Sequence, residues 1–431
     1  MKIYLSGISG VGIGPLAEFA HDAGHAVFGS DIASGQINRE LTEKGIGFHI
    51  GPQDGAYLQQ VYDEQGGLDW FIHTSALPPD SPELLLAQKL GIKTGKRDTL
   101  LPILIEEHSL KLIAIAGTSG KTTTTNMMTW AMLQTGVPVS YLNGSTVPYG
   151  YAGHYDPKSE YLVYECDEFD RNFLAYHPYL SLITSIAYDH AEIYPTEEEY
   201  YDAFKQFVNQ SKTVIHWRDD SRGYWPEESE SNVIIQDFID ERFTLKGAVN
   251  RKDATLVLSA MRTLGFDHVD EIIAALNAFP GTGRRFEELA PNLYSDYAHL
   301  PEELLALLQK AREVGDPQGL KVALVYEPLQ NMRQYQIRDQ YNKTFVNADR
   351  IFWLPTYLIP GREDDRPVLT PADLIQYIDD PSKATPAELN DQLFADVKAL
   401  LDDKYLVVIA AGGKTGDKFF REHIDEFNRE S

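Results

Sequence analysis

The 431-residue sequence has little cysteine, few basic residues and no long hydrophobic run. Its one cysteine, Cys166, excludes an intrachain disulfide framework and is compatible with a reducing compartment. No apolar stretch approaches the length of a membrane-spanning helix, and residues 1–7 run into a glycine loop without the apolar segment of a signal peptide. We therefore expect a cytoplasmic protein that does not bind membranes.

Acidic residues greatly outnumber basic ones. The sequence has 64 Asp and Glu against 38 Lys and Arg, a formal net charge of −26. Such a field repels nucleic acids and anionic lipids, so neither is expected as a partner. An anionic small-molecule substrate would need a local pocket of cationic side chains or a metal ion. The apolar fraction of 43% is typical of a globular protein, and the length predicts two or three domains.

The most informative stretch joins an apolar strand to a helix through two glycines. A predicted strand at 112–116 is followed by the loop Gly117–Gly120 and by a predicted helix at 126–135. Backbone N–H groups of such a loop, with the helix N-terminus, can hold a polyphosphate, so ATP or GTP binding is predicted. Lys121 would reach the terminal phosphates, and the Thr122 hydroxyl would ligate Mg²⁺. The general P-loop pattern, G-x-x-x-x-G-K-[ST], requires glycine at 115, where this sequence has Ile115.

A second glycine loop lies near the N-terminus. A predicted strand at 2–6 precedes the loop Gly7–Gly14, a helix follows, and a strand at 26–28 leads to Asp31. This is a βαβ unit with an acidic residue after its second strand. Its glycines are spaced G-x-x-G-x-G rather than G-x-G-x-x-G, so the pattern is weak support for a dinucleotide site.

Buried strands alternate with helical segments along the chain, which predicts an α/β fold with parallel sheets. We expect three domains, at 1–107, 108–283 and 284–431. A polar link at 106–109 marks the first boundary, and a Pro/Gly cluster at 279–283 marks the second. The first and third domains are predicted to be Rossmann-like, and the central domain to be a P-loop ATPase-like parallel sheet.

Carboxylates and an imidazole follow two buried strands of the central domain. The acidic stretch Glu165–Asp170 follows a predicted strand at 161–164, and His190 follows one at 180–186. Ligands bind at the carboxyl ends of strands in open α/β sheets, so these side chains are candidates for phosphate or metal contacts. Solvated loop acids and a hydrogen-bonded surface histidine are the alternatives.

Together these motifs resemble those of the Mur ligase family, the ATP-dependent enzymes that build the peptide of bacterial cell-wall precursors. The resemblance covers nearly the whole chain. Residues 7–14 and 29–31 resemble the glycine loop and G-S-D of members that take UDP-N-acetylmuramate. The other matching segments are 117–124 (family G-T-H-G-K-T-T-T, with Ser119 for histidine), 165–170 (E-A-D-E-x-D, with Cys166 for alanine), 189–194 (D-H-x-D-x-[YF]), 284–286 (R-R-F) and 295–301 (D-D-Y-x-H-H-P).

The resemblance implies an ATP- and Mg²⁺-dependent ligase that joins the carboxylate of UDP-N-acetylmuramate to the amine of L-alanine through an acyl phosphate. An alternative family activity joins the same sugar nucleotide to the tripeptide L-alanyl-γ-D-glutamyl-diamino acid during cell-wall recycling. Residues 357–363 are similar to a segment of the first type, I-Y-P-A-R-E, whereas 189–194 and 326–331 look closer to the second. We favour the first. Outside the family, the alternatives are a nucleotide switch and an NAD(P) dehydrogenase.

The resemblance also implies site residues. The catalytic residues would be Lys121, Glu165 and His190, and the metal ligands Thr122, Glu165 and His190. The residues contacting ATP would be Gly117, Thr118, Ser119, Gly120, Lys121, Thr122, Thr123, Asn250, Arg285 and Asp296. Those contacting the UDP-sugar would be Gly7, Ile8, Ser9, Gly10, Gly12, Asp31, Thr74 and Ser75. Tyr297 and Arg333 would orient the amino-acid substrate.

Two positions leave questions open. Residues 247–254 correspond to the family motif G-x-H-N-x-x-N-A. This sequence has Val249 in place of the motif's histidine and Asp253 in place of its second asparagine, which leaves the adenine contacts undefined. Lys205 lies at the distance after the D-H motif where several Mur ligases carry a carbamylated lysine, although we favour an exposed, unmodified side chain. We expect small-molecule substrates as partners and a monomer or weak dimer.

Overall fold

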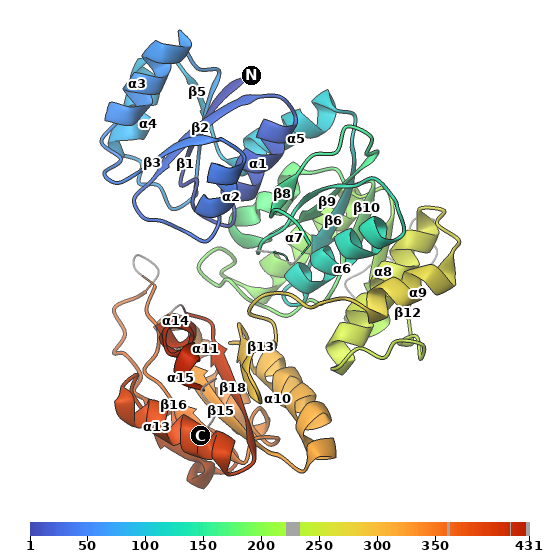
Figure 1. Ribbon diagram of the computed structural model, residues 1–431, viewed down its shortest axis with the longest axis vertical. Coiled ribbons are helices and arrows are strands. Elements are labelled where there is room, and N and C mark those ends of the chain that lie inside the picture. Colours follow the sequence, from blue (N-terminus) through green and yellow to red (C-terminus); the bar gives the residue numbers. More distant parts are fainter. Residues whose placement is uncertain (146, 148, 221–232, 360–362, 414, 428–431) are drawn as a thin grey trace. The chain divides into compact units, whose positions relative to one another are not determined.

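The computed structural model describes residues 1–145, 147, 149–220, 233–359, 363–413 and 415–427 (Figure 1). Residues 360–362 of the segment 357–363 therefore lie outside the described residues. The chain divides into two compact units, one of Met1–Phe243 with Lys252–Pro280 and one of Thr244–Arg251 with Gly281–Ser431. Three mostly parallel sheets confirm the predicted α/β fold class. The domain boundaries at 107 and 283 stay predictions.

The first sheet has five parallel strands in the order β3-β2-β1-β4-β5. Because β1 and β2 pair in parallel, the glycine loop and Asp31 meet at one edge, as the βαβ pattern predicts. The strands are β1 (Lys2–Ser6), β2 (Ala26–Asp31), β3 (Gly47–Ile50), β4 (Trp70–His73) and β5 (Lys93–Gly95). The helices are α1 (Gly14–Asp22), α2 (Asn38–Glu43), α3 (Ala56–Gln65), α4 (Pro82–Lys89) and α5 (Arg97–Glu107).

The central sheet has seven strands in the order β12-β11-β10-β6-β9-β7-β8, all parallel except β8. The strand before the P-loop, β6, lies in its middle and is almost entirely buried, as its apolar sequence predicts. The strands are β6 (Lys111–Ala116), β7 (Ser140–Leu142), β8 (Gly153–His154), β9 (Tyr161–Glu165), β10 (Leu180–Ile183), β11 (Val214–Trp217) and β12 (Val233–Gln236). The helices are α6 (Lys121–Gln134), α7 (Glu197–Gln210), α8 (Ala248–Thr263) and α9 (Val269–Asn277).

Helix α6 begins at Lys121, so the prediction of a helix from Asn126 was wrong at this end. The four threonines at 122–125 have low helix propensity. Burial outweighs that propensity, because Thr123–Thr129 lie almost completely inside the protein. Strand β10 was predicted too long, because it ends at Ile183 rather than at Ile186.

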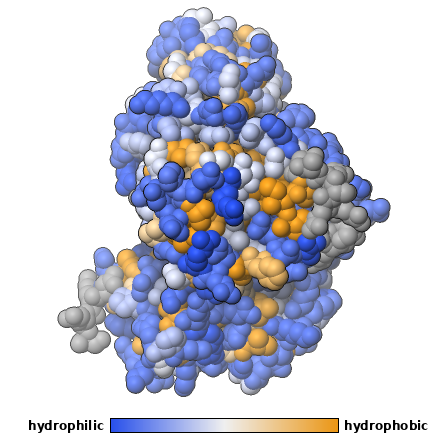
Figure 2. All heavy atoms as spheres, turned by 90° about the vertical axis from the view of Figure 1, so that its right-hand side faces the viewer, coloured by the Kyte–Doolittle hydropathy of each residue, from blue (hydrophilic) through white to orange (hydrophobic). Residues whose placement is uncertain are grey.

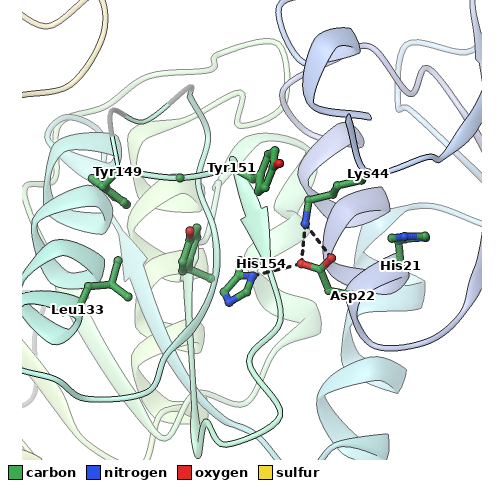
Figure 3. A pocket seen from close by; sticks show the side chains of 9 residues that line it. His21, Asp22, Lys44, Leu133, Tyr149, Tyr151 and His154 are labelled. Atoms are coloured by element: carbon green, nitrogen blue, oxygen red, sulfur yellow. Dashed lines mark hydrogen bonds and ion pairs between the residues drawn. The ribbon is translucent and has the colours of Figure 1, made fainter. Parts of the chain in front are cut away.

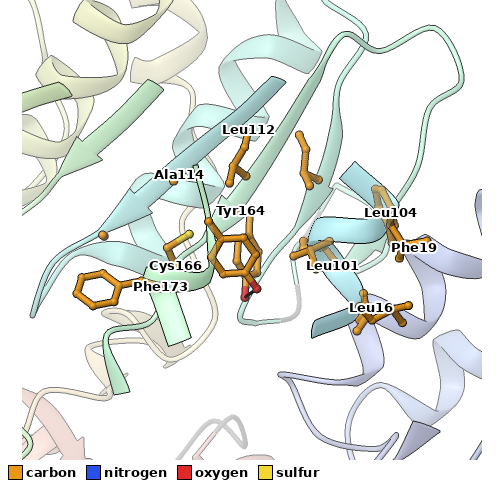
Figure 4. Close-up of a cluster of buried hydrophobic side chains, with 14 of the residues drawn as sticks. Leu16, Phe19, Leu101, Leu104, Leu112, Ala114, Tyr164, Cys166 and Phe173 are labelled. Atoms are coloured by element: carbon orange, nitrogen blue, oxygen red, sulfur yellow. Dashed lines mark hydrogen bonds between the residues drawn. The ribbon is translucent and has the colours of Figure 1, made fainter. Parts of the chain in front are cut away.

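One hydrophobic cluster joins the first two sheets within the first unit. Figure 4 shows Leu16 and Phe19 of α1 beside Leu101 and Leu104 of α5, with side chains of the central sheet next to them. Every one of these four side chains is completely buried. The two sheets therefore share a continuous apolar core.

Two buried carboxyls lie at the edge of this shared core. Glu18 of α1 accepts a hydrogen bond from the Gly153 N–H at 2.6 Å, and Glu40 of α2 accepts one from the Ala152 N–H at 2.9 Å. Glu18 is completely buried and Glu40 is 6% exposed. We call the contact made by these four residues the carboxyl seam. It connects helices of the first sheet to the start of β8.

The second unit contains the third sheet, with strand order β13-β14-β18-β15-β16-β17, parallel except for β13. Its strands are β13 (Glu287–Ala290), β14 (Leu293–Asp296), β15 (Lys321–Glu327), β16 (Arg350–Trp353), β17 (Ala384–Pro386) and β18 (Tyr405–Ala411). Its helices are α10 (Pro301–Gly315), α11 (Asn331–Ile337), α12 (Pro371–Ile375), α13 (Asp391–Asp402), α14 (Thr415–Glu422) and α15 (Ile424–Phe427). Pro301 starts α10, where a missing N–H costs nothing.

The surface is mostly hydrophilic, with separate hydrophobic areas on the face shown in Figure 2. Exposed large apolar side chains include Phe238, at 86%, and Ile32, at 71%. Within the described ranges, each helix is too short or too polar to cross a bilayer.

Candidate active site

The loop between β6 and α6 depends on two glycines with positive φ. Gly117 has φ of 139°, and a Cβ at this position would lie 2.4 Å from Thr184 Oγ1 and 2.7 Å from the Ser185 carbonyl oxygen. Gly120 has φ of 88° and immediately precedes the first residue of α6. Glycine is therefore required at 117 both by conformation and by space. This is the geometry predicted for a phosphate-binding loop.

Lys121 lies inside this loop. Its Nζ donates to the Gly117 carbonyl oxygen at 2.6 Å and forms an ion pair with Glu168 at 2.8 Å. Glu168 is completely buried and the Lys121 side chain is 13% exposed. Burial opposes the charge on Lys121, but Glu168 and Asp167 outweigh it and hold the pKa of Lys121 above its usual range. The loop therefore carries a fixed positive charge.

Thr122 and Glu165 form a second pair beside the lysine. The Thr122 hydroxyl donates to Glu165 Oε1 at 3.0 Å. A Cβ on Gly144 would lie 2.5 Å from Glu165 Oε2, so the chain after β7 approaches this carboxylate closely. The predicted metal ligands Thr122 and Glu165 are thus brought together, with only oxygen atoms facing each other.

His190 joins a different group of carboxylates. Ligand atoms of Asp167, Glu168 and His190 all lie within 4.8 Å of one another, and Nε2 of His190 is 3.8 Å from Glu168 Oε1. Burial acts to raise the pKa of Asp167, but Lys121, the Phe169 N–H and His190 outweigh it and lower that pKa. We call Lys121, Asp167, Glu168 and His190 the P-loop cluster. It carries both signs of charge at the carboxyl ends of β9 and β10.

Sequence reasoning left Glu168 out of the predicted site residues. Its motif was recognised, but the motif alone did not indicate which of its carboxylates would contact Lys121. Glu168 is 47 residues from Lys121 in the sequence, and its backbone carbonyl accepts a hydrogen bond from the Tyr194 hydroxyl at 2.6 Å. Three separate segments of the central sheet therefore fix its position.

The predicted UDP-sugar residues gather at the carboxyl edge of the first sheet. The Gly7 and Ile8 N–H groups both donate to the Ser30 carbonyl oxygen, and the Ser9 N–H donates to Asp31 Oδ2 at 2.9 Å. A Cβ on Gly7 would lie 2.9 Å from Thr74 Cγ2. Ser75 is exposed, Ile8 is completely buried, and Gly10 donates to the Gly7 carbonyl oxygen.

Arg97 is a cation at this edge that sequence reasoning missed. Its guanidinium nitrogen Nη1 lies 3.3 Å from the position a Cβ would take on Gly12, and its Cζ lies 5.5 Å from the Tyr164 ring centroid. Arg97 is the first residue of α5 and Tyr164 lies in β9. A basic residue at the start of a helix, after the short strand β5, was the available signal.

In the second unit, Arg284 and Arg285 flank one aromatic ring. Each guanidinium carbon lies 5.0 Å from the centroid of the Tyr297 ring. Asp296 accepts hydrogen bonds from the Phe286 and Ala298 N–H groups, both at 2.7 Å. Burial raises the pKa of Asp296 although Arg285 opposes it. The predicted residues Arg285, Asp296 and Tyr297 therefore form one group.

Three other positions considered in the sequence are described one by one. Arg333 is 6% exposed on α11. The Asn250 side chain donates to the Lys246 carbonyl oxygen at 3.0 Å near the start of α8. Lys205 is exposed on α7, as we favoured.

A pocket of about 630 Å³ lies at the end of α1 opposite the glycine loop. Figure 3 shows Lys44 and His154 directed toward Asp22, with Tyr149 and Tyr151 nearby. Lys44 Nζ lies 2.6 Å from Asp22 Oδ2, and His154 Nδ1 lies 3.2 Å from the same oxygen. This pocket contains none of the predicted site residues.

Comparisons with known proteins match most of the chain. Residues 2–109 match the model described as the Mur ligase family, catalytic domain, and residues 115–257 match the Mur ligase middle domain. A UDP-N-acetylmuramate–L-alanine ligase of Thermosynechococcus vestitus is 31% identical over 85% of this chain and 83% of its own length. One of Cytophaga hutchinsonii is 29% identical over 97% of this chain and 95% of its own length.

A solved structure has the same fold. The UDP-N-acetylmuramate-alanine ligase of Thermotoga maritima superimposes with a TM-score of 0.76, covering 99% of both chains at 21% sequence identity. The P-loop, the carboxylate motif after β9 and the matched family models agree with one another. The chain belongs to the Mur ligase family, acid–amino-acid ligases that form C–N bonds.

Proposed function

We propose that this protein joins the carboxylate of UDP-N-acetylmuramate to the amine of L-alanine, with ATP as the energy source, in peptidoglycan precursor synthesis. The observation that carries the proposal is the P-loop cluster within a chain whose 31% identical relative has this activity in its name. A carboxylate is a poor electrophile. Its attack on the γ-phosphate of ATP forms an acyl phosphate, and the amine then displaces phosphate from the activated carbonyl.

The residues present suit Mg²⁺, the ion typical of this family. Mg²⁺ prefers oxygen ligands, and the Thr122 hydroxyl and Glu165 carboxylate lie together beside the loop. We propose these two residues as ligands of one ion and His190 as a ligand of a second. Bound there, Mg²⁺ neutralises phosphate charge during phosphoryl transfer.

We propose that Lys121 stabilises the transferring phosphoryl group. It holds a positive charge at the loop, in contact with the Gly117 carbonyl and Glu168. A preorganised cation lowers the barrier because it needs no reorganisation as negative charge moves. Glu168 and His190 would position the lysine and the carboxylates around it. The loop residues Thr118, Ser119 and Thr123 would contribute the remaining phosphate contacts.

The remaining proposed substrate contacts follow from which predicted residues lie near each sheet. We propose that the Gly7–Gly12 loop, Asp31 and the Thr74–Ser75 segment contact the UDP-sugar. Arg97 beside this loop offers a cation for a diphosphate. Arg285, Asp296 and Asn250 are proposed ATP contacts, and Tyr297 and Arg333 are proposed to orient the amino acid.

We further propose a cytoplasmic enzyme of three domains, divided at 107 and 283, that acts as a monomer or weak dimer on small molecules. Its net charge of −26 argues against nucleic-acid and anionic-lipid partners.

The second candidate activity uses the murein tripeptide as the amine. It is favoured by residues 189–194 and 326–331, which look closer to the recycling enzyme than to the alanine ligase. The two activities share every step except the identity of the amine. They are therefore separated by substrate specificity alone.

Phosphate release from ATP and Mg²⁺ with UDP-N-acetylmuramate tests the proposal. L-alanine, other amino acids and the tripeptide are added separately, and the product mass identifies the new bond. Release that depends on L-alanine is expected. Release with the tripeptide alone would assign the recycling activity, and no turnover with any amine would refute the ligase proposal.

A further inference from the structure

Two histidines and a glutamate meet at the amino-terminal side of the first sheet. His25 lies just before β2, and Glu107 and His108 lie at the end of α5. One ligand atom of each residue lies within 4.8 Å of the other two. Nε2 of His25 is 3.7 Å from Glu107 Oε2. We call these three residues the histidine cluster.

Each imidazole of the cluster has one buried nitrogen, Nε2, without a hydrogen-bond partner among the described residues. Nε2 of His25 and Nε2 of His108 are both inaccessible to solvent. His25 as a whole is 7% exposed. A buried nitrogen without a partner loses its interaction with water and gains nothing in return. Two such nitrogens in one cluster, one of them 3.7 Å from a carboxylate oxygen, require an explanation.

The opposite ring nitrogens are already held. Nδ1 of His108 lies 3.0 Å from the Tyr155 hydroxyl, and Nδ1 of His25 lies 3.0 Å from the Met1 amino nitrogen. Histidines that bind metals through Nε2 typically donate a hydrogen bond from Nδ1. His108 can do so to Tyr155 directly.

We propose that His25, Glu107 and His108 bind a divalent transition-metal ion, with Zn²⁺ as the best match. Two imidazoles and a carboxylate suit Zn²⁺, whose fourth ligand would be water. Tetrahedral bonds of about 2.1 Å place ligand atoms about 3.4 Å apart. The cluster therefore contracts on binding, and Glu107, whose side chain is 44% exposed, has room to move inward.

The ion would fasten the two sheets of the first unit. His25 lies just before β2 of the first sheet and Glu107 ends α5. Tyr155 follows β8 of the central sheet and packs edge-on against Phe19 of α1, with ring centroids 5.5 Å apart. Fixing His108 would fix the Tyr155 hydroxyl in turn. The site is structural, and it shares no residue with the P-loop cluster.

Zinc content of the full-length protein tests the proposal. The protein is incubated with ZnCl₂ in excess Mg²⁺, separated from free metal by gel filtration and analysed by mass spectrometry for bound zinc. The other candidate metal group in the described chain contains His190, so His190→Gln is included. We expect His190→Gln to retain zinc in the histidine cluster and His108→Gln to lose that zinc.

Two further variants keep the test independent of folding defects. Glu107→Gln changes a partly exposed side chain, and Tyr155→Phe keeps all three ligands but removes the partner of His108. Zinc affinity should fall on the order of 10-fold or more in Tyr155→Phe. His268→Gln, at an 83% exposed side chain, is the matched control and should bind as the unmodified protein does.

Zinc should also raise the thermal unfolding midpoint of the unmodified protein and of His190→Gln, but not that of His108→Gln. Retention of zinc by both His108→Gln and Glu107→Gln would overturn the proposal. Complete loss of zinc in His190→Gln would also overturn it, because the ion would then reside in the P-loop cluster.

Discussion

The P-loop cluster and the carboxyl seam each bury a glutamate completely, but they treat its charge differently. Burial raises the pKa of Glu168, and the Lys121 ammonium, 2.8 Å away, opposes that rise. One carboxyl oxygen of Glu18 accepts a hydrogen bond from the Gly153 N–H. Its other oxygen, Oε1, has no hydrogen-bond partner among the described residues, and a proton shared with Glu40 would give it one. Burial, with Glu40 adding to it, raises the pKa of Glu18 from the usual 4.5 to about 9.

The difference shows how the surroundings of a buried carboxyl serve different ends. An ion pair costs desolvation energy on both partners and supplies a lysine of fixed position and charge, which the proposed phosphoryl transfer requires. A protonated carboxyl needs no counter-ion and can donate to a neighbouring carboxylate. The carboxyl seam holds two sheets together and needs no charge on Glu18. The same residue type therefore pairs with a proposed catalytic lysine in one place and joins two sheets in the other.

The largest expected effect comes from removing the cation of the P-loop cluster. Lys121→Met should lower the ligase rate on the order of 10³-fold, because the transferring phosphoryl group loses its preorganised positive charge. It also leaves Glu168 buried without its counter-ion. Steady-state phosphate release measures the rate. Lys111→Met, at an exposed lysine paired with Glu160, is the control, and equal losses in both variants would contradict the assignment.

Exchanging each buried glutamate for glutamine compares the two regions directly. Glu168→Gln should lower the ligase rate on the order of 10²-fold, because Lys121 loses its charged partner. Glu18→Gln should leave the rate within about twofold, since glutamine resembles a protonated glutamate and Glu18 lies outside the active site. Parallel rate measurements decide. A large rate loss in Glu18→Gln would remove the distinction between the regions.

The pH dependence of stability should follow Glu18. Because its pKa is higher in the folded chain than in the unfolded chain, the folded state binds more protons between about pH 4.5 and 9. The free energy of unfolding should therefore fall as pH rises through this window, by up to about 1.4 kcal/mol per pH unit from this group. Denaturant unfolding at pH 7, 8 and 9 measures the slope. Glu18→Gln should flatten it, and an unchanged slope would show that Glu18 is already ionised.

The smallest effect is expected at an exposed ion pair next to the active site. Lys96 Nζ lies 2.6 Å from Asp170 Oδ2, but both side chains are more than a third exposed. Lys96→Met should change the free energy of unfolding by less than about 1 kcal/mol, because water already screens this pair. Denaturant unfolding at neutral pH measures the free energy of unfolding of this variant and of Lys121→Met. If Lys96→Met lost as much unfolding free energy as Lys121→Met, burial would not distinguish the exposed ion pair from the buried one.

Much of the fold could be predicted because its signals are local. The apolar run of β6, the two glycines after it and the alternation of strands with helices gave the α/β class and the glycine loop between β6 and α6. Short strands such as β3, β5 and β7 were missed, since three or four residues carry little periodicity. Their pairing comes from neighbours distant in the sequence.

The sequence by itself determined the order of strands and helices, the glycines of both loops and the motifs of the family, because these depend on neighbouring residues. Only the tertiary structure decided which carboxylate meets Lys121, why Glu18 favours its proton and how Arg97 comes to lie beside Gly12. Each depends on burial and on contacts across many residues, such as the 135 that separate Glu18 from Gly153. Local sequence does not encode the solvent exposure of a charge, and solvent exposure sets its protonation and its partner.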